Sequence, residues 1–574
     1  MHPTGGSAIA CPRVWRENES GAGRTPLAGA PSGIRGRLPK NRLDSNEGAS
    51  GATVTRRVTR ILQTLHTRPQ AQVGLLMLAA LVLRLLWLAY THHTAEDAFV
   101  TFRFARNLAQ GYGFTYNLGE RVYATTTPLF ALLLAGWRLI LRGDIVIGSH
   151  ALGLVASLGS LLLLDAILRQ ENIALGARLL ALAVLALCSK VIVLDMQGME
   201  IPLVIFLLMA SWHSYACGRA RLAGLLAGWL LWVRIDLALW PAALVIVEGW
   251  TNRKRAVEVA GVAALTYLPW AVFASLYFGS PIPHTITAKQ VAYGLAHGPV
   301  LGHLTTVLAY LSPFDGNWPP QAADLAAGCL TLGLAIWQVS RVGRSKAFAT
   351  LALFAALEFA GLVLARATFF ARYLYPLLWA VLILASLGVV SLWQAGARRW
   401  LCRRWIAAMV CLVFAAMLLV QTVQVAGRMR ATQRYRYEAS LQAIGAWLGE
   451  RGPAGATVLL EPLGYIGYCS DMRMVDEVGL VSPDVVALKL RGVPVEEYFS
   501  VFWPEFIVEH CDEATRFEQT QTGAGVRFAD HYTRVATFDP LGFGADVAPQ
   551  VAAHSELGRS ACYIVWQRNL GATP

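Results

Sequence analysis

Apolar runs recur along the chain and predict its architecture. They occupy residues 73–90, 145–164, 201–216, 257–276, 347–364, 374–392 and 406–420. Each approaches or reaches the roughly 20 residues that a helix needs to cross a bilayer. The composition agrees, because 55% of the 574 residues are hydrophobic, and 18 Trp and 18 Tyr fit the aromatic belts of membrane interfaces. The pattern predicts a polytopic α-helical membrane protein.

Basic residues gather between the apolar runs and indicate the topology. The clusters lie at residues 56–68, 169–178, 219–221, 253–255, 341–346 and 398–404. If the short segment 128–141 crossed the membrane, the clusters from residue 169 onward would lie outside. Arg138 interrupts this segment, so we interpret it as an interfacial or re-entrant helix, and all the clusters then lie on the cytoplasmic side. The result is about 11 transmembrane helices and a cytoplasmic N-terminus. Because topology accounts for the net charge of +13, we expect no nucleic-acid partner.

The polarity of the chain predicts three regions. Residues 1–70, rich in Gly, Pro and Arg, read as a disordered cytoplasmic leader. Residues 71–427 form the transmembrane domain, and residues 428–574 a soluble extracytoplasmic α/β domain. In that last region we expect a helix at 439–450 and strands at 457–460, 506–508, 534–538 and 563–566. Its three cysteines, Cys469, Cys511 and Cys562, allow at most one disulfide among themselves, and their pairing stays open.

The outer loop at residues 91–144 is the most informative segment. Apolar positions at helical spacing after Glu96 predict a short amphipathic helix, ended by Gly111 and Gly113. Thr94 is a candidate cap, with Asp97 completing a capping box. Glu96 and Asp97 therefore have two interpretations. They are acidic residues that suit the helix dipole, or a pair in which one carboxylate deprotonates an acceptor hydroxyl and the other positions it.

Several charged residues stand in or beside the expected outer segments. Four of them are basic and do not follow the positive-inside trend: Arg103, Arg106, Lys289 and Arg372. They are candidates to bind a phosphate or, alternatively, lipid headgroups. Arg234 and Asp236 interrupt the apolar stretch 222–247, which indicates a charged cavity, a break between two spans, or both. Asp195 and Glu200 bracket an outer turn, as solvated loop residues or as functional acids.

A longer motif carries a family resemblance. Residues 96–130 resemble the first outer loop of C-type glycosyltransferases, especially bacterial polyprenyl-phosphate-dependent enzymes similar to mycobacterial terminal arabinofuranosyltransferases. The matching positions include Glu96, Asp97, Arg103, Asn107, Gly111, Gly113, Asn117, Gly119, Glu120, Val122, Pro128 and Leu129. Later matches are Gly198-Met199-Glu200, Arg234-Ile235-Asp236, the segment 277–289 with His284 and Lys289, and Arg372-Tyr373-Leu374-Tyr375-Pro376. The chain departs from the family at Glu96, Ile235 and His284, which leaves open which carboxylate is the base and which donor is used.

The resemblance implies an inverting glycosyltransferase of that fold. Its donor would be a polyprenyl-phosphate sugar, arabinofuranosyl or mannosyl, and its acceptor an envelope glycan, lipid or protein. The resemblance also implies that the reaction takes place on the outer face of a bacterial plasma membrane. Asp97 or Glu96 would be the base, and Arg103, Arg106, Lys289 or Arg372 would hold the phosphate. Substrate contacts are implied for Asn117, Glu120, Asp195, Glu200, Arg234, Asp236 and His284. We expect no metal ligands and no obligatory cofactor, although a divalent metal is possible.

Two other functions remain open from the residues. One is a polytopic transporter or lipid-linked sugar flippase that uses Arg234 and Asp236 as a charged pathway. The other is a binding or scaffold protein whose outer loop has lost activity, an alternative that the departure at Glu96 keeps open.

Overall fold

The computed structural model describes residues 69–294, 299–315, 321–341, 345–365, 370–396, 403–435, 437–453, 455–539, 562–569 and 571. Residues 76–574 form one compact unit, and the following description concerns this unit. The expected leader, residues 1–70, lies outside the described residues except for its last two. Parts of two basic clusters, residues 342–344 and 398–402, also lie outside the described residues. The proposed domain boundary between residues 427 and 428 stays a prediction.

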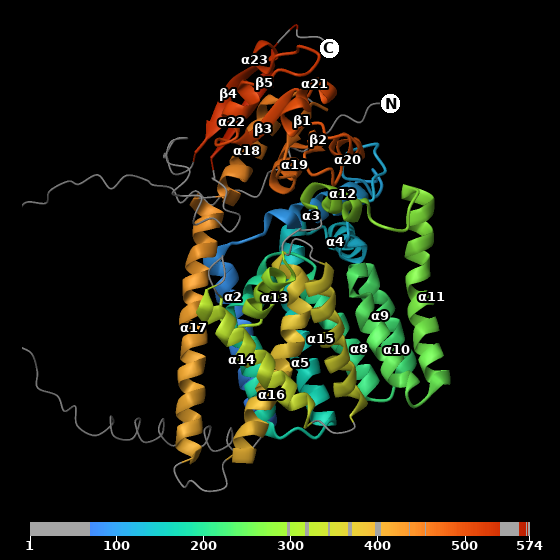
Figure 1. The fold of residues 1–574 in the computed structure, drawn as a ribbon, viewed down its shortest axis with the longest axis vertical. Helices are drawn as coiled ribbons and strands as arrows, with labels where there is room; N and C mark the ends of the chain where they lie inside the picture. Colours follow the sequence, from blue (N-terminus) through green and yellow to red (C-terminus); the bar gives the residue numbers. More distant parts are fainter. Residues whose placement is uncertain are drawn as a thin grey trace, which may run out of the picture. The chain divides into compact units, whose positions relative to one another are not determined.

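The described residues between 69 and 435 form helices joined by loops (Figure 1). These helices are α2 (Pro69–Thr91), α3 (Glu96–Ala109), α4 (Pro128–Ile140), α5 (Ile145–Gln170), α6 (Leu175–Leu187), α7 (Ser189–Met196), α8 (Ile201–Ala216), α9 (Ala220–Val233), η1 (Ile235–Ala238), α10 (Leu239–Gly249), α11 (Arg253–Phe278), α12 (His284–Tyr293), α13 (Val300–Tyr310), α14 (Ala322–Val339), α15 (Lys346–Ala365), α16 (Ala371–Gly396) and α17 (Arg403–Tyr435).

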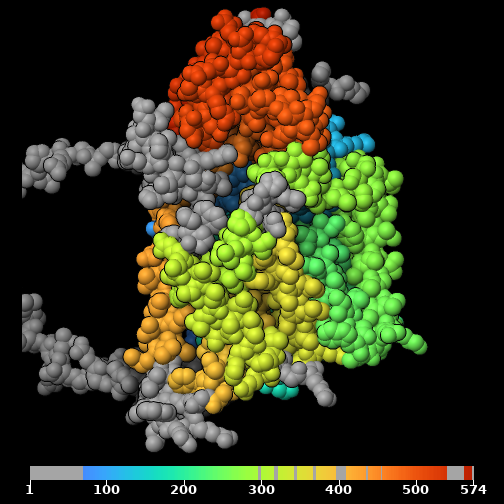
Figure 2. Space-filling view, in the orientation of Figure 1, coloured from blue at the N-terminus to red at the C-terminus, as the bar shows by residue number. Residues whose placement is uncertain are grey.

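Many of these helices are built for a lipid environment. Seven are long and apolar enough to cross a membrane, and α6 with α7, bent by 58° at Cys188, would make an eighth span. Four shorter apolar helices, α4, α8, α9 and α13, accompany them. Peripheral helix α11, green in Figure 2, exposes Val257, Leu265 and Leu276. Such contiguous apolar exposure suits acyl chains. The polytopic helical class is therefore confirmed, whereas the number of about 11 spans stays a prediction.

The outer-loop helix forms at the expected place but begins differently. Helix α3 starts at Glu96, and its N-cap is Ala95, which offers no side-chain cap. The expected cap at Thr94 is wrong, because its hydroxyl lies 3.0 Å from Nε2 of His150 and its N–H donates to Gln433. Gly111 and Gly113 follow the helix with positive φ angles, as expected for residues that end it. The short apolar segment 128–141 does form a helix, α4.

The C-terminal residues form an α/β structure around one five-stranded sheet. Its helices are α18 (Tyr437–Arg451), α19 (Gly464–Ser470), α20 (Pro483–Leu490), η2 (Val495–Glu497), α21 (Phe499–Phe502), α22 (Ala514–Glu518) and α23 (Phe528–His531). Its strands are β1 (Thr457–Leu460), β2 (Arg473–Asp476), β3 (Phe506–His510), β4 (Tyr532–Phe538) and β5 (Tyr563–Arg568), in the order β2-β1-β3-β5-β4. Strand β1 is parallel to β2 and β3, and β5 is antiparallel to β3 and β4.

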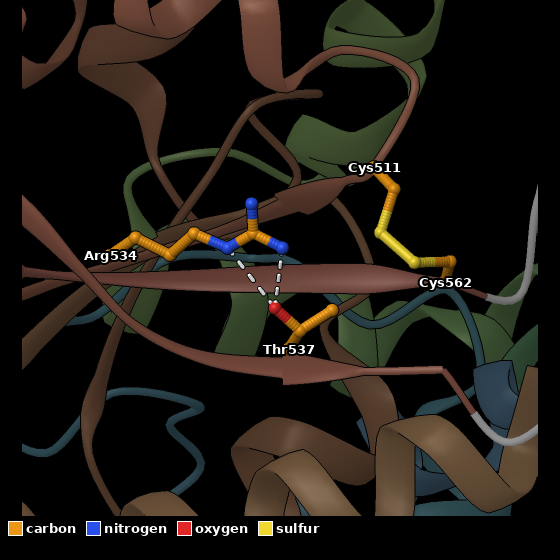
Figure 3. The surroundings of a disulfide bond; sticks show 4 residues. All are labelled: Cys511, Arg534, Thr537 and Cys562. Atoms are coloured by element: carbon orange, nitrogen blue, oxygen red, sulfur yellow. Dashed lines mark hydrogen bonds between the residues drawn. A yellow bond between two sulfur atoms is a disulfide. The ribbon is translucent and has the colours of Figure 1, made fainter. Parts of the chain in front are cut away.

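One disulfide ties this sheet together. Cys511 directly follows β3, Cys562 directly precedes β5, and the two are bonded (Figure 3). The bond closes a loop of 51 residues in sequence, which restricts the unfolded chain and so stabilises the domain. Ile507, Ile564 and Trp566 pack in the core of the domain beside this bond.

Candidate functional site

The two adjacent carboxylates at the start of α3 point to different neighbours. The carboxylate of Glu96 accepts a hydrogen bond from the backbone N–H of Gly464, the first residue of α19. A Cβ at Gly464 would overlap the backbone of Glu96, so this approach requires glycine. Asp97 instead forms an ion pair with Arg372 at the start of α16, which lies 275 positions away in sequence. The side chain of Asp97 stays 42% exposed, so a substrate can reach it.

Two cations and two aromatic rings surround the Asp97 carboxylate. Lys289 of α12 donates to the Tyr373 hydroxyl at 3.3 Å and lies 5.2 Å from the centre of the Phe370 ring. The guanidinium of Arg372 lies 4.5 Å from the same Phe370 ring. Rings that face both cations hold them in place without neutralising their charge. Helices α3, α12 and α16 therefore bring one carboxylate and two cations together.

The surroundings shift the pKa values of the two acids in opposite directions. Burial, followed by the charge of Asp97, raises the pKa of Glu96 well above its ordinary value, although the hydrogen bond from Gly464 opposes the change. Burial alone would also raise the pKa of Asp97, but Arg372 and Lys289 outweigh it and lower this pKa. A hydrogen bond with Glu96 acts in the same direction. At neutral pH, Asp97 is therefore ionised, and the raised pKa favours the protonated form of Glu96.

A second charged group lies at the break between α9 and α10. Arg234 donates to both carboxylate oxygens of Asp236, at 3.0 and 2.5 Å, and lies 3.5 Å from Glu200. Its guanidinium stands 4.6 Å from the centre of the Tyr373 ring. The helices break here, as one interpretation predicted, and the charges pair with one another, whereas a charged cavity at this place stays a prediction. Through Tyr373, this group adjoins Lys289 and Arg372.

Arg103 and Arg106, the other two cations of the sequence prediction, join α3 to α19. Arg103 donates to the carbonyl oxygens of Gly467 and Met472, at 2.9 and 2.6 Å, and is 2% exposed. Arg106 donates to the carbonyl oxygen of Tyr468 at 2.7 Å and pairs with Asp471. Because these contacts occupy terminal nitrogens of both guanidinium groups, they hold the outer helix against the C-terminal domain.

Three other predicted site residues also contact the C-terminal domain. Asn117 pairs with the backbone of Met474 in β2 through two hydrogen bonds, of 2.9 and 3.0 Å. Glu120 forms an ion pair with Arg473 at 2.6 Å. Nε2 of His284 lies 3.1 Å from the carbonyl oxygen of Gly479. These contacts show docking of the domain, and their link to a substrate stays a prediction.

Asp195 lies apart from the charges around Asp97. Within the helical core it pairs with Arg84 at 3.0 Å, accepts from Tyr375 at 2.7 Å and accepts from Ser157. It is 2% exposed, and its partners come from α2, α5 and α16. This network cross-links three helices, and a substrate role for Asp195 stays untested.

Sequence analysis missed Tyr373 and the α19 helix as parts of the site. The signal for Tyr373 was its place beside Arg372, at the polar end of an apolar run. The segment from Gly464 to Tyr468 resembles the outer domain of the same family, but the role of Gly464 depends on the close approach of α3, which the local sequence does not show. Within the described part of the chain, no group of three or more His, Cys, Asp or Glu side chains is arranged to hold a metal ion.

Comparison with solved structures identifies the fold as that of the C-type glycosyltransferases. ArnT from Cupriavidus metallidurans, solved bound to undecaprenyl phosphate, matches with a TM-score of 0.55 and 14% identity, over 88% of this chain and 99% of that one. The archaeal oligosaccharyltransferase AglB from Archaeoglobus fulgidus, solved with an inhibitory peptide and a dolichol-phosphate, matches with a TM-score of 0.53 and 10% identity, over 88% and 89%.

Other comparisons add less. The arabinofuranosyltransferase AftD from Mycobacteria has a TM-score of 0.46 and 16% identity, over 87% of this chain and 40% of that one, so no conclusion about the sugar is drawn from it. Residues 427–563 match the model of a domain of unknown function, DUF8728. No curated protein matches the sequence. The resemblance to C-type glycosyltransferases is thus confirmed at the level of the fold.

Proposed function

We propose that this protein is an inverting glycosyltransferase that moves a sugar from a polyprenyl-phosphate donor to a hydroxyl acceptor. The observation that carries the proposal is the meeting of Asp97 with Arg372 and Lys289, in the fold of the C-type glycosyltransferases. A sugar phosphate needs cations at its leaving group, and an acceptor hydroxyl needs a nearby base. Asp97 at the start of α3 supplies the base, and Lys289 of α12 and Arg372 of α16 supply the cations.

The proposed reaction is a single displacement. The acceptor oxygen attacks the anomeric carbon and loses its proton to Asp97, while the bond between that carbon and the phosphate oxygen breaks. Polyprenyl phosphate leaves with the bonding electrons, and its negative charge is held by Arg372 and Lys289. The sugar carbon is inverted because attack and departure occur on opposite faces.

Two sets of contacts support our choice among the candidate residues that the sequence left open. We assign the base to Asp97, because its lowered pKa keeps it ionised, whereas Glu96 has a raised pKa and accepts a hydrogen bond from Gly464. We place phosphate binding on Arg372 and Lys289 rather than on Arg103 and Arg106, whose guanidinium groups are engaged by α19 and the residues after it. After the phosphate has left and Asp97 has passed its proton to water, the ionised carboxylate pairs with Arg372 again.

We propose an extracytoplasmic location for the site. The disulfide between Cys511 and Cys562 favours an oxidising compartment for the C-terminal domain, and α19 of that domain touches the start of α3. On that face, nucleotide sugars are absent and lipid-linked donors are present. The acceptor is then an envelope glycan, lipid or protein.

The test uses the full chain reconstituted in detergent with a panel of polyprenyl-phosphate sugars, including arabinofuranosyl and mannosyl donors. Release of polyprenyl phosphate that depends on an added acceptor supports the proposal. Asp97→Asn should reduce this release about 10²- to 10⁴-fold without loss of fold. The matched control is Asp471→Asn, the same substitution at a carboxylate that follows α19 and pairs with Arg106, near the other end of α3. Sugar movement across liposomes without any transfer would favour the transporter instead.

A further inference from the structure

The short helix α12 carries Lys289, one of the two cations that we assign to the donor phosphate. The helix has ten residues, and its N-cap, Pro283, makes no side-chain cap hydrogen bond. Gly279 precedes it and Gly294 follows it, both with positive φ angles. A helix of this length is marginal by itself, so contacts with the rest of the molecule must hold it in place.

His284, the first residue of α12, contacts two other regions of the chain. Its backbone N–H donates to the carbonyl oxygen of Tyr123 in the outer loop at 2.9 Å. Its imidazole Nε2 lies 3.1 Å from the carbonyl oxygen of Gly479 in the C-terminal domain. Because a carbonyl oxygen can only accept, Nε2 carries the proton of this hydrogen bond. One residue therefore joins α12 to both the outer loop and the C-terminal domain.

Both residues that His284 contacts are themselves held in place. The hydroxyl of Tyr123 accepts from Nε1 of Trp270 at 2.6 Å, and the Tyr123 ring stacks on Phe278 with 4.9 Å between centres. Gly479 lies in the turn between β2 and α20, where its N–H donates to the carbonyl oxygen of Asp476 at 3.0 Å. Its φ angle of 86° favours glycine, which fixes the form of this turn. The two acceptors of His284 are therefore rigid points of attachment.

Helix α12 relates the position of His284 to that of Lys289. Lys289 lies five positions after His284, or about 7.5 Å along the helix axis. Between them, Thr285 and Ala288 are buried, and α12 packs against α20. The Lys289 ammonium group donates to the hydroxyl of Tyr373 at 3.3 Å. A shift or rotation of the first turn of α12 would therefore move Lys289 away from this hydroxyl.

We propose that His284 is a positioning residue for the donor phosphate. By holding the start of α12 against the C-terminal domain, it keeps Lys289 beside Arg372. This inference rests on the proposed function, since it takes Lys289 to bind the phosphate of a polyprenyl-phosphate donor. The resemblance implied a substrate contact for His284, whereas its imidazole engages a backbone carbonyl oxygen and acts on the donor through α12. Docking of the domain and binding of the donor are then linked through one side chain.

The test measures equilibrium binding of polyprenyl phosphate to the full chain in detergent, which does not require turnover. Lys289→Gln should weaken binding about 10- to 100-fold, as expected for a lost hydrogen bond between charged groups. His284→Ala should weaken it about 5- to 30-fold. His284→Gln, whose Nε2 can donate from a similar place, should stay within about threefold of the wild type.

A double variant shows whether His284 acts through Lys289. In protein that already carries Lys289→Gln, the further change His284→Ala should weaken binding less than about twofold, because the group that it positions is gone. The control is Arg473→Gln, which removes an ion pair of 2.6 Å between the same outer loop and the same domain without touching α12. Its affinity for polyprenyl phosphate should stay within about twofold of the wild type.

Several results would overturn the inference. They are unchanged binding by His284→Ala or by Lys289→Gln, separate losses that multiply in the double variant, and a His284→Gln protein as weak as His284→Ala. Equal weakening by Arg473→Gln, with a lowered unfolding temperature in both proteins, would show a general structural role and overturn it as well. If the two residues are coupled but no acceptor receives sugar, the inference stands and the transferase proposal fails. Sugar transfer together with independent losses gives the reverse result.

Discussion

The two ends of helix α3 carry opposite charges and use them in different ways. At the N-terminal end, Asp97 is 42% exposed and meets a cation from a distant helix, α16. At the C-terminal end, Arg103 is almost fully buried and donates to carbonyl oxygens of the C-terminal domain. The first arrangement leaves charge that a substrate can reach, and the second uses charge to fix the helix. One short helix therefore serves as both a docking element and a support for reactive groups.

This comparison explains why α19 is rich in small residues. A Cβ at Gly464 would overlap the backbone of Glu96, and one at Gly467 would overlap the hydroxyl of Tyr116. Glycine lets the domain approach closely enough for Arg103 to reach its carbonyl oxygens. The close approach also fixes the direction of α3 and, with it, the position of Asp97.

The largest effect should follow from a change at the exposed end. Arg372→Gln keeps a polar side chain but removes the charge that we assign to the donor phosphate. We expect transfer of sugar to fall about 10²- to 10³-fold, as for the loss of a group that stabilises developing charge. The thermal unfolding temperature should change little, because the Asp97 carboxylate stays exposed to water. Near-normal transfer by a folded Arg372→Gln protein would contradict the proposed phosphate site.

Arg103→Gln tests the buried end and should produce the opposite pattern. The substitution leaves carbonyl oxygens of Gly467 and Met472 without a donor, at a cost of about 1–3 kcal/mol in stability. A lowered unfolding temperature in detergent would be the main result, with transfer per folded molecule nearly unchanged. If transfer fell as far as in Arg372→Gln while stability stayed normal, Arg103 would belong to the catalytic group after all.

Glu96→Gln should change how stability depends on pH. The pKa of Glu96 is raised in the folded protein, so the folded state binds this proton more tightly than the unfolded chain does. Stability from this group is fully present below its unfolded pKa and is lost as pH rises through the folded pKa. Glutamine cannot titrate, so the variant does not lose this stability as pH rises. The unfolding temperature of the variant minus that of the wild type should therefore increase by a few degrees between acidic and mildly alkaline pH. Parallel profiles for the two proteins would contradict the raised pKa.

The smallest effect is expected for Asp471→Asn. Asp471 pairs with Arg106, but its side chain is 52% exposed, and exposed ion pairs contribute up to about 1 kcal/mol. Denaturation by urea should therefore show a small shift of the midpoint, and transfer should be unchanged. A loss of transfer here would mean that the position of α3 depends on this pair more than on Arg103.

The sequence predicted regular elements well where the local pattern was strong. Strand β1 has the expected bounds, β3, β4 and β5 extend the expected ones by a few residues, and α18 extends the expected helix. Strand β2 was missed because it is only four residues long and begins and ends with charged residues, Arg473 and Asp476. The expected cap at Thr94 failed because a tertiary contact with His150 took its hydroxyl.

By itself, the sequence determined the membrane class, the outer helix with its acidic pair, and the residues that carry the resemblance, because hydrophobic period and motif spacing are local properties. Only the tertiary structure decided which cations meet which acids. Asp97 and Arg372 are 275 positions apart, and Arg103 and Met472 are 369 apart, so no local pattern could separate a cation beside a substrate site from one that fixes a domain. The opposite pKa shifts of Glu96 and Asp97 have the same origin, since burial and distant charges set them.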